Sequence, residues 1–248
     1  WQLGLFYLNE DGSQSFAGDA GAFVGNFAEQ IENETDSYAV FAEGTYKFTD
    51  ALSLTGGLRW TQDEKEYSDT CLSTPSVLNL LACQPASGAT VDLDDDWDEL
   101  TGKLSLNYQL NDDQLVYLGF SQGYQSGGYR TLCFGNLTAA CGGTPFDPQT
   151  VDSIEAGWKA ELFDNRLRLN AVAFYAMYED IQQVVTNFAG GFPIDNIGDV
   201  DVYGLELEIL WAPIDDLNVY ANLGIQESDF GSVSPLSPPG GLGDSCVD

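Results

Sequence analysis

The sequence contains no histidine, and it has only 8 Lys plus Arg residues against 39 Asp plus Glu, which gives a net charge of −31. Without histidine the chain has no Ser-His-Asp triad and no His-based zinc site. Such a shortage of cations excludes nucleic-acid binding, because contacts to phosphates require a basic surface. The sequence also offers no candidate catalytic nucleophile that is accompanied by a general base. The sequence therefore predicts a protein that is not an enzyme and has no cofactor.

Long hydrophobic runs are also missing. Hydrophobic residues make up 44% of the chain, yet no apolar run reaches the ~18 residues that a membrane-spanning helix needs. The chain has alternation instead. In the segment 203–211, one face of an extended strand would carry Tyr203, Leu205, Leu207, Ile209 and Trp211, and the other Gly204, Glu206 and Glu208. An apolar face with an aromatic residue at each end, backed by a charged face, is typical of a strand between lipid and water.

The same alternation with a period of two recurs along the chain and predicts about nine strands. These strands span residues 1–8, 36–48, 52–66, 96–110, 114–124, 150–162, 167–182, 199–212 and 217–228. Short connections, near 49–51, 111–113, 163–166 and 213–216, take turns with long ones, near 9–35, 67–95, 125–149 and 187–198. Asn, Asp and Pro in the short connections favour tight turns. The predicted fold class is all-β: an antiparallel transmembrane β-barrel segment with short periplasmic turns and long extracellular loops.

The number of strands carries information of its own. Single-chain bacterial barrels have an even number of strands, whereas the first and last strands expected here both run outward. Such a sheet cannot close on itself, and we interpret residues 1–248 as an internal part of a longer barrel. The alternative is a soluble acidic β-sheet protein with one solvated face.

The polar faces of the predicted strands carry charges of both signs. Mixed signs suit a water-filled interior, because buried charges are tolerated when they are paired or hydrated. The spacing of Glu206 and Glu208 is interpreted as two solvated charges rather than a catalytic pair. The residues expected to face the lumen are Glu43, Arg59, Lys103, Glu155, Lys159, Glu161, Arg168, Glu206 and Glu208.

All five cysteines fall in predicted long loops. Cys71 and Cys83 bracket one loop, and Cys133 and Cys141 bracket another, whereas Cys246 has no nearby partner. Two bracketing pairs predict two disulfides formed in an oxidising compartment such as the periplasm, with free thiols as the alternative. A metal site is disfavoured because the chain has no CxxC motif.

One acidic segment partly matches a calcium-binding loop. Asp92, Asp94 and Asp96 stand at its first three ligand positions, but Trp97 replaces the required glycine and Lys103 the final glutamate. A solvated strand tip is the other interpretation of this segment. The weaker hypothesis of an improvised Ca²⁺ site would use Asp92, Asp94, Asp95, Asp96 and Asp98.

Four segments, in this order and spacing, resemble the barrel of TonB-dependent outer-membrane receptors of the siderophore-receptor type. The resemblance covers nearly the whole chain, and the last three segments together make it specific. The segments are SYAVFAE at 37–43 with LTGGLRW at 54–60, VYLGFSQGYQSGGY at 116–129, SIEAGWKAEL at 153–162 with RLRLNAVAFY at 166–175, and YGLELE at 203–208.

Membership of this family would imply a location in the bacterial outer membrane and a barrel of about 22 strands around a plug. The chain would then be a partial barrel, 1–248, without the plug domain and the C-terminal strands. The family's function implies that the inner-membrane TonB complex pulls on the plug and so drives uptake of a scarce small molecule, such as a ferric siderophore. A passive porin is the alternative.

The resemblance also directs attention to the place where a strand enters a large loop. Tyr124, Gln125, Tyr129 and Arg130 lie there, and aromatic rings with one cation suit an aryl, iron-chelating anion. The other interpretation of these aromatic residues is an interface belt at the membrane surface.

Overall fold

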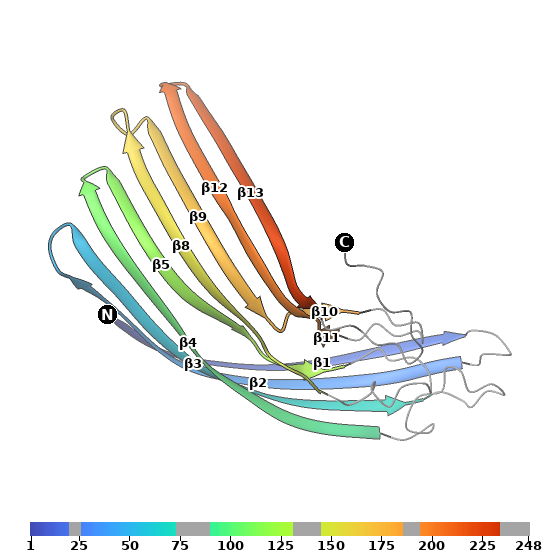
Figure 1. Ribbon diagram of the computed structural model, residues 1–248. Helices are drawn as coiled ribbons and strands as arrows, with labels where there is room; N and C mark the ends of the chain where they lie inside the picture. Colours follow the sequence, from blue (N-terminus) through green and yellow to red (C-terminus); the bar gives the residue numbers. More distant parts are fainter. Residues whose placement is uncertain (20–25, 73–89, 131–144, 186–193, 234–248) are drawn as a thin grey trace.

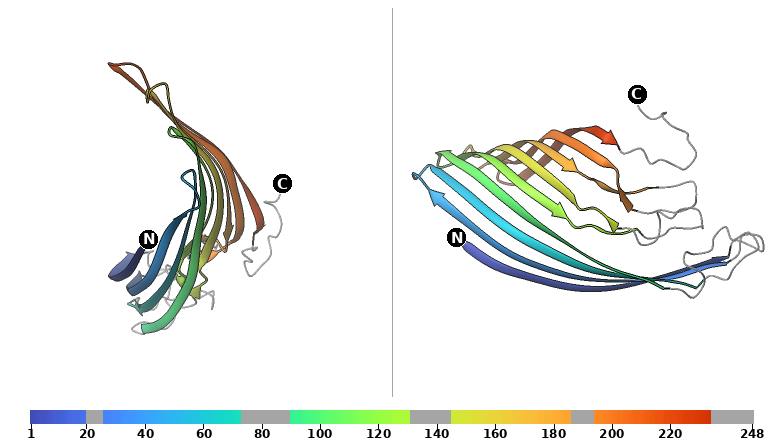
Figure 2. Two further views of the ribbon diagram at one scale, coloured as in Figure 1. Left: turned by 90° about the vertical axis from the view of Figure 1, so that its left-hand side faces the viewer. Right: turned by 60° about the horizontal axis from the view of Figure 1, so that its bottom comes forward.

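The computed structural model of the protein describes residues 1–19, 26–72, 90–130, 145–185 and 194–233. Within these ranges it contains one nine-stranded antiparallel sheet, curved and open, with its two edges at the first and the last strand (Figures 1 and 2). No helix in this part of the chain is long and apolar enough to cross a membrane. In sheet order, the strands are β1 (Gln2–Asp19), β2 (Asn26–Lys47), β3 (Leu52–Cys71), β4 (Thr90–Asn111), β5 (Gln114–Gln125), β8 (Gln149–Leu162), β9 (Leu167–Glu179), β12 (Gly198–Ile214) and β13 (Leu217–Val233).

Four tight turns lie together at one end of the sheet, which we call the short-turn end, and the opposite end is the loop end (Figure 1). Local hydrogen bonds hold these turns. The Thr49 hydroxyl accepts bonds from the backbone N–H groups of Ala51 and Leu52, at 3.2 and 2.9 Å. A left-handed backbone, which Asn and Asp adopt more readily than most residues, occurs in the third turn at Phe163, Asp164 and Asn165, with φ of 56°, 55° and 63°. The predicted antiparallel connectivity is therefore confirmed.

The pairing register places the alternating apolar residues of the strands on one face of the sheet. Directly paired positions share a face, and one such row crosses five strands. The apolar residues stay exposed in this chain: Leu205 is 61% and Leu223 58% exposed. So large an exposed apolar surface marks contact with a membrane or another protein. We call this side the apolar face and the opposite side the polar face. The row consists of Leu104, Phe120, Ile154, Tyr175 and Tyr203.

The first four strands are much longer than the sequence predicts, and this is a correction. Residues 9–35 and 67–95 were expected to be loops, but β1 and β2 pair without interruption from Gln2↔Glu43 to Asp19↔Asn26. Likewise β3 and β4 pair as far as Thr70↔Thr90. One face of these extensions carries Asp and Glu, and the other carries only scattered apolar residues such as Phe16, Ile31 and Tyr67, so the hydrophobic alternation is weak there. The backbone ladder, by contrast, can form with any side chain that tolerates an extended conformation.

An aromatic boundary crosses the apolar face toward the loop end. Each of its aromatic side chains donates a hydrogen bond to a carboxylate on the next strand. Beyond it, the same face of β1 to β4 carries Asp and Glu instead of apolar residues. The boundary comprises four pairs: Tyr7–Asp36 at 2.8 Å, Trp60–Asp98 at 3.2 Å, Tyr175–Asp201 at 2.6 Å and Tyr203–Glu227 at 3.1 Å.

Candidate ligand-binding face

The polar face carries all nine charged residues that the sequence places in a lumen, because the register aligns them with one another and opposite the apolar rows. Several of these charges have partners on this face. Lys103 forms an ion pair with Glu43 on a strand two away, and Arg168 forms one with Glu161 at 2.8 Å. The structure therefore brings the predicted polar side chains to a single surface.

Glycines let aromatic rings lie flat on this face. Gly157 pairs with Tyr117, and a Cβ atom at Gly157 would stand 2.1 Å from that ring. The ring in turn lies 5.6 Å, centroid to Nζ, from the ammonium group of Lys159. Gly4 has the same relation to Phe41, again at 2.1 Å. A larger residue at either glycine would push the ring away from the sheet and shift the polar groups around it.

Tyr129, one of the expected ligand-binding residues, is buried in an aromatic cluster on the polar side of the extensions. It is 8% exposed and stacks on Tyr67, which is 2% exposed, with ring centroids 5.2 Å apart. Trp97 packs edge-on against it at 6.1 Å. The hydroxyl group of Tyr129 donates a 3.2 Å bond to the backbone oxygen of Lys65. Burial is the main cause that raises the pKa of Tyr129 to about 12.

Lys65 holds the segment before Tyr129 against the polar face of β3 and β4. Its ammonium group donates a 2.7 Å bond to the carbonyl oxygen of Gly127 and lies 5.7 Å from the Trp97 ring centroid. Burial lowers the pKa of Lys65, although the negative charge of Asp63 acts in the opposite direction. A cation–π contact and a carbonyl thus hold a partly desolvated cation. The residues that directly follow β5 are thereby held against the polar face of β3 and β4.

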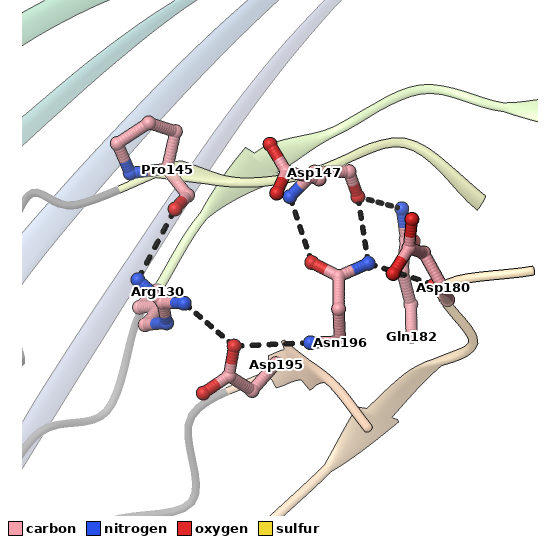
Figure 3. Close-up of polar contacts among 7 residues, drawn as sticks. All are labelled: Arg130, Pro145, Asp147, Asp180, Gln182, Asp195 and Asn196. Atoms are coloured by element: carbon pink, nitrogen blue, oxygen red, sulfur yellow. Dashed lines mark hydrogen bonds and ion pairs between the residues drawn. The ribbon is translucent and has the colours of Figure 1, made fainter. Parts of the chain in front are cut away.

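Arg130, the expected cationic contact for a ligand, joins two connections at the loop end (Figure 3). Its guanidinium group pairs with Asp195 at 2.5 Å and donates to the carbonyl oxygen of Pro145 at 3.1 Å. Pro145 belongs to the short strand β7 (Pro145–Phe146), which pairs with β6 (Gly128–Tyr129). Asp195 belongs to β11 (Ile194–Asn196), which pairs with β10 (Gln182–Val184).

The side chain of Asn196 reinforces this junction, as Figure 3 also shows. Its amide nitrogen donates to the carbonyl oxygens of Asp147, at 3.0 Å, and Asp180, at 2.7 Å. Its amide oxygen accepts a 2.8 Å bond from the Asp147 N–H group. Sequence reasoning missed Asn196 and Lys65, and no local pattern marks either residue, because their partners lie between 16 and 62 positions away.

Tyr124 and Gln125 point to different surroundings. The buried hydroxyl group of Tyr124 has its pKa raised by burial first and then by the negative charge of Asp63. Gln125 lines a cavity of about 700 Å³ on the polar face. The four residues expected to bind a ligand therefore do not surround one cavity: Tyr129 and Arg130 hold the loop end together, and Gln125 alone lines the cavity.

The segment that resembles a calcium loop is part of strand β4. Asp92, Asp94, Asp96 and Asp98 alternate along one face of this strand, and Asp95 lies on the other. An extended strand separates alternate residues by about 6.6 Å, so it does not wrap its side chains around one ion as a loop does. Among the residues that the structure describes, no group of three or more Asp, Glu, Cys or His side chains could hold a metal ion.

The two disulfides remain predictions, because Cys83, Cys133 and Cys141 lie outside the described residues, and Cys71 is the last residue of β3. We expect Cys71–Cys83 and Cys133–Cys141 in protein isolated from outer membranes. Each would stabilise the fold by about 2–3 kcal/mol by restricting the unfolded chain. Peptide mapping without reduction measures the pairing. Four free thiols in the native protein would contradict it.

The fold and the polar face together define a piece of a β-barrel with an apolar outer surface, and the comparisons give its family. The chain belongs to the TonB dependent receptor-like, beta-barrel family, whose model matches residues 1–239. It is 28% identical to the Pesticin receptor of Yersinia enterocolitica, over 81% of this chain and 27% of that protein. It is 26% identical to the catecholate siderophore receptor Fiu of Escherichia coli (strain K12), over 71% of this chain and 24% of the relative.

A solved structure has a similar fold. The ferric yersiniabactin uptake receptor FyuA from Yersinia pestis superposes with a TM-score of 0.72 at 23% identity, over 92% of this chain and 32% of that chain. These relatives are receptors and not enzymes, in line with the prediction from the sequence. The chain spans about a quarter of the length of the curated relatives that it matches.

Proposed function

We propose that this chain forms part of the barrel wall of an outer-membrane receptor that imports a scarce small molecule, a ferric siderophore, with energy supplied by TonB. The observation that carries the proposal is the two-faced sheet of a TonB-dependent receptor family, apolar on one side and charged on the other. Relatives named for siderophores support the class of ligand. The partners would be outer-membrane lipid, the receptor's own plug domain, the TonB complex and the ligand.

In this mechanism the described residues form part of the barrel wall and of its opening at the loop end. The apolar face contacts lipid, and the polar face borders the plug and the path of the ligand. Paired charges such as Glu43 with Lys103 keep that path hydrated without leaving an isolated buried charge. The ion pair of Arg130 and Asp195 joins the residue after β6 to β11. The loops would capture the ligand and the plug would couple its passage to TonB.

Two deletions in the full-length receptor separate capture from transport. Deleting residues 131–144, which lie outside the described residues, is expected to weaken ligand capture by whole cells and leave the barrel folded, because loop tips contribute little to a sheet. Deleting the TonB box of the plug is expected to do the reverse: radiolabelled ligand binds at the surface, but uptake stops.

Whole-cell binding and uptake of radiolabelled ferric siderophore measure the two steps, with gel mobility as the control for folding. Uptake that continues without the TonB box, or after the proton gradient is collapsed, would mean passive diffusion. That result would contradict the energised mechanism and favour a porin.

A further inference from the structure

A cavity of about 700 Å³ lies on the polar face where β5, β8, β9, β12 and β13 approach the loop end, and Gln182 and Gln183 of β10 border it. Its volume lies within the range of about 300–1,000 Å³ that is typical of small-molecule sites. Strand pairing places the lining residues of the sheet on one surface, for example Ser153 beside Ala176 and Glu155 beside Phe174.

Side-chain amides dominate the polar lining. The side-chain amide of Gln182 is already hydrogen-bonded within the fold. Its nitrogen donates to the carbonyl oxygens of Ser126 and Asp147, both at 3.0 Å. The others include three whose side chains form no hydrogen bond with any other described residue. Each such amide offers two N–H donors and an acceptor oxygen. The glutamines of the lining are Gln125, Gln149, Gln182, Gln183 and Gln226, and the three without such a bond are Gln125, Gln183 and Gln226.

The charge of the cavity has one sign. Glu155 and Glu206 line it, and none of its described lining residues is Lys or Arg. Lys159 lies farther along β8 and directs its ammonium group to the Tyr117 ring. Arg130 pairs with Asp195 at the loop end. An anion entering the cavity would meet two carboxylates, whereas a cation or a neutral polar molecule would not be repelled.

Apolar surface completes the lining. Phe174 and Tyr178 border the cavity from the same strand, β9, together with aliphatic side chains such as Val202. Aromatic rings beside amides suit a molecule that has flat or apolar parts between its polar groups.

We propose that this cavity binds a ligand of zero or positive net charge that is rich in hydroxyl, carbonyl or amide groups. The inference rests on the proposed function and specifies it: the receptor takes a neutral or cationic chelate and discriminates against polyanionic ones. It replaces the expectation of an anionic ligand at Arg130, because the structure gives the guanidinium group of that residue a carboxylate partner outside the cavity lining.

A first experiment measures the charge preference of the cavity without any natural ligand. Ser153→Cys is introduced into the full-length receptor, and the thiol is treated with two reagents of matched size, a cationic trimethylammonium-ethyl and an anionic sulfonatoethyl methanethiosulfonate. Mass spectrometry of the peptide that contains residue 153 gives both rates. The control is Ser53→Cys, which lies on the same face outside the cavity and pairs with Lys47.

We expect the ratio of cationic to anionic rates to be at least about tenfold higher at position 153 than at position 53, because a cleft lined by one sign of charge concentrates counter-ions. Combining Glu155→Gln with Glu206→Gln should bring the ratio toward that of the control. If the double variant does not fold, Glu206→Gln alone should lower the ratio in part. Equal ratios at the two positions in the unaltered background, or a ratio that folded Glu→Gln variants leave unchanged, would overturn the proposal.

A second experiment separates this inference from the proposed function. Quenching of tryptophan fluorescence in the purified full-length receptor gives the affinity for a neutral ferric trihydroxamate and for a trianionic ferric tris-catecholate. We expect the neutral chelate to bind at least about tenfold more tightly, and tighter binding of the trianion would overturn the charge preference. If neither chelate binds while the thiol rates differ as expected, the iron-chelate function is refuted and the charge preference of the cavity stands.

Discussion

Leu207→Arg is expected to block membrane assembly of the full-length receptor, whereas Glu206→Arg should assemble normally. Leu207 lies on the apolar face, directly between Ala171 and Leu223. A charge on the lipid side of a barrel strand near the middle of the bilayer costs about 2–4 kcal/mol. Glu206 is the adjacent residue, but it borders the cavity on the polar face, where a new charge stays hydrated.

The fraction of folded receptor in outer membranes, measured by heat-modifiable gel mobility, compares the two variants. The pair forms its own control, since both changes introduce the same side chain one position apart. Equal tolerance of the two substitutions would contradict the assignment of the lipid side. Protein that is folded and soluble without detergent would favour the soluble acidic β-sheet alternative.

Tyr67→Ala is expected to release β6 and the residues between β5 and β6 from the polar face of the sheet. Tyr67 is 2% exposed and stacks on Tyr129. Truncating a fully buried aromatic side chain to alanine costs about 3–5 kcal/mol, which combines lost contacts with the cavity left behind. That loss removes the main apolar support of Tyr129, while the long backbone ladders of β2, β3 and β4 remain.

Hydrogen exchange of the backbone amides near Gly128 and Tyr129 in the full-length receptor measures the release, and exchange there should become much faster. Tyr220→Ala is the control, because Tyr220 is 74% exposed and the same truncation removes few contacts there. Unchanged protection in the Tyr67→Ala variant would show that the cluster does not anchor this segment.

The sheet could be predicted from the sequence wherever one face is apolar. Residues such as Leu205, Leu207 and Ile209 alternate with charged neighbours, and a shift of the register by one residue would turn every one of them to the wrong face. The extensions of β1 to β4 could not be predicted in this way. Between Asn9 and Asp19 the alternation disappears: Phe16 packs against the buried cluster of Ile31, Tyr67 and Tyr129, but the neighbouring residues along the strand are polar or small, and backbone pairing with β2 holds the whole segment.

The candidate site was much less accessible to sequence reasoning. Arg130 attracted attention as a lone cation near a loop, but its partner Asp195 is 65 positions away. The glutamines of the cavity are spread from Gln125 to Gln226 and become neighbours only when five strands pair. No spacing rule within one segment connects residues that a sheet brings together across several hairpins.

The aromatic boundary also determines how the strands stand in a membrane. Tyr7 shares a row of directly paired residues with Asp98 of β4. Tyr203, seven strands across the sheet from Tyr7, shares its row with Leu104 of the same β4. The boundary therefore moves six residues along β4, from Asp98 to Leu104, as it crosses the sheet.

At ~3.3 Å per residue this offset is about 20 Å, and seven strand spacings of ~4.8 Å amount to about 34 Å. When the aromatic side chains lie level with the membrane surface, as the proposed location requires, the strands lean by about 30° from the membrane normal. This lean approaches the 35–45° typical of closed outer-membrane barrels. The four hydrogen-bonded aromatic residues thus mark the level of the membrane surface on the sheet. The strands of this open sheet already have nearly the tilt of the strands in a complete barrel.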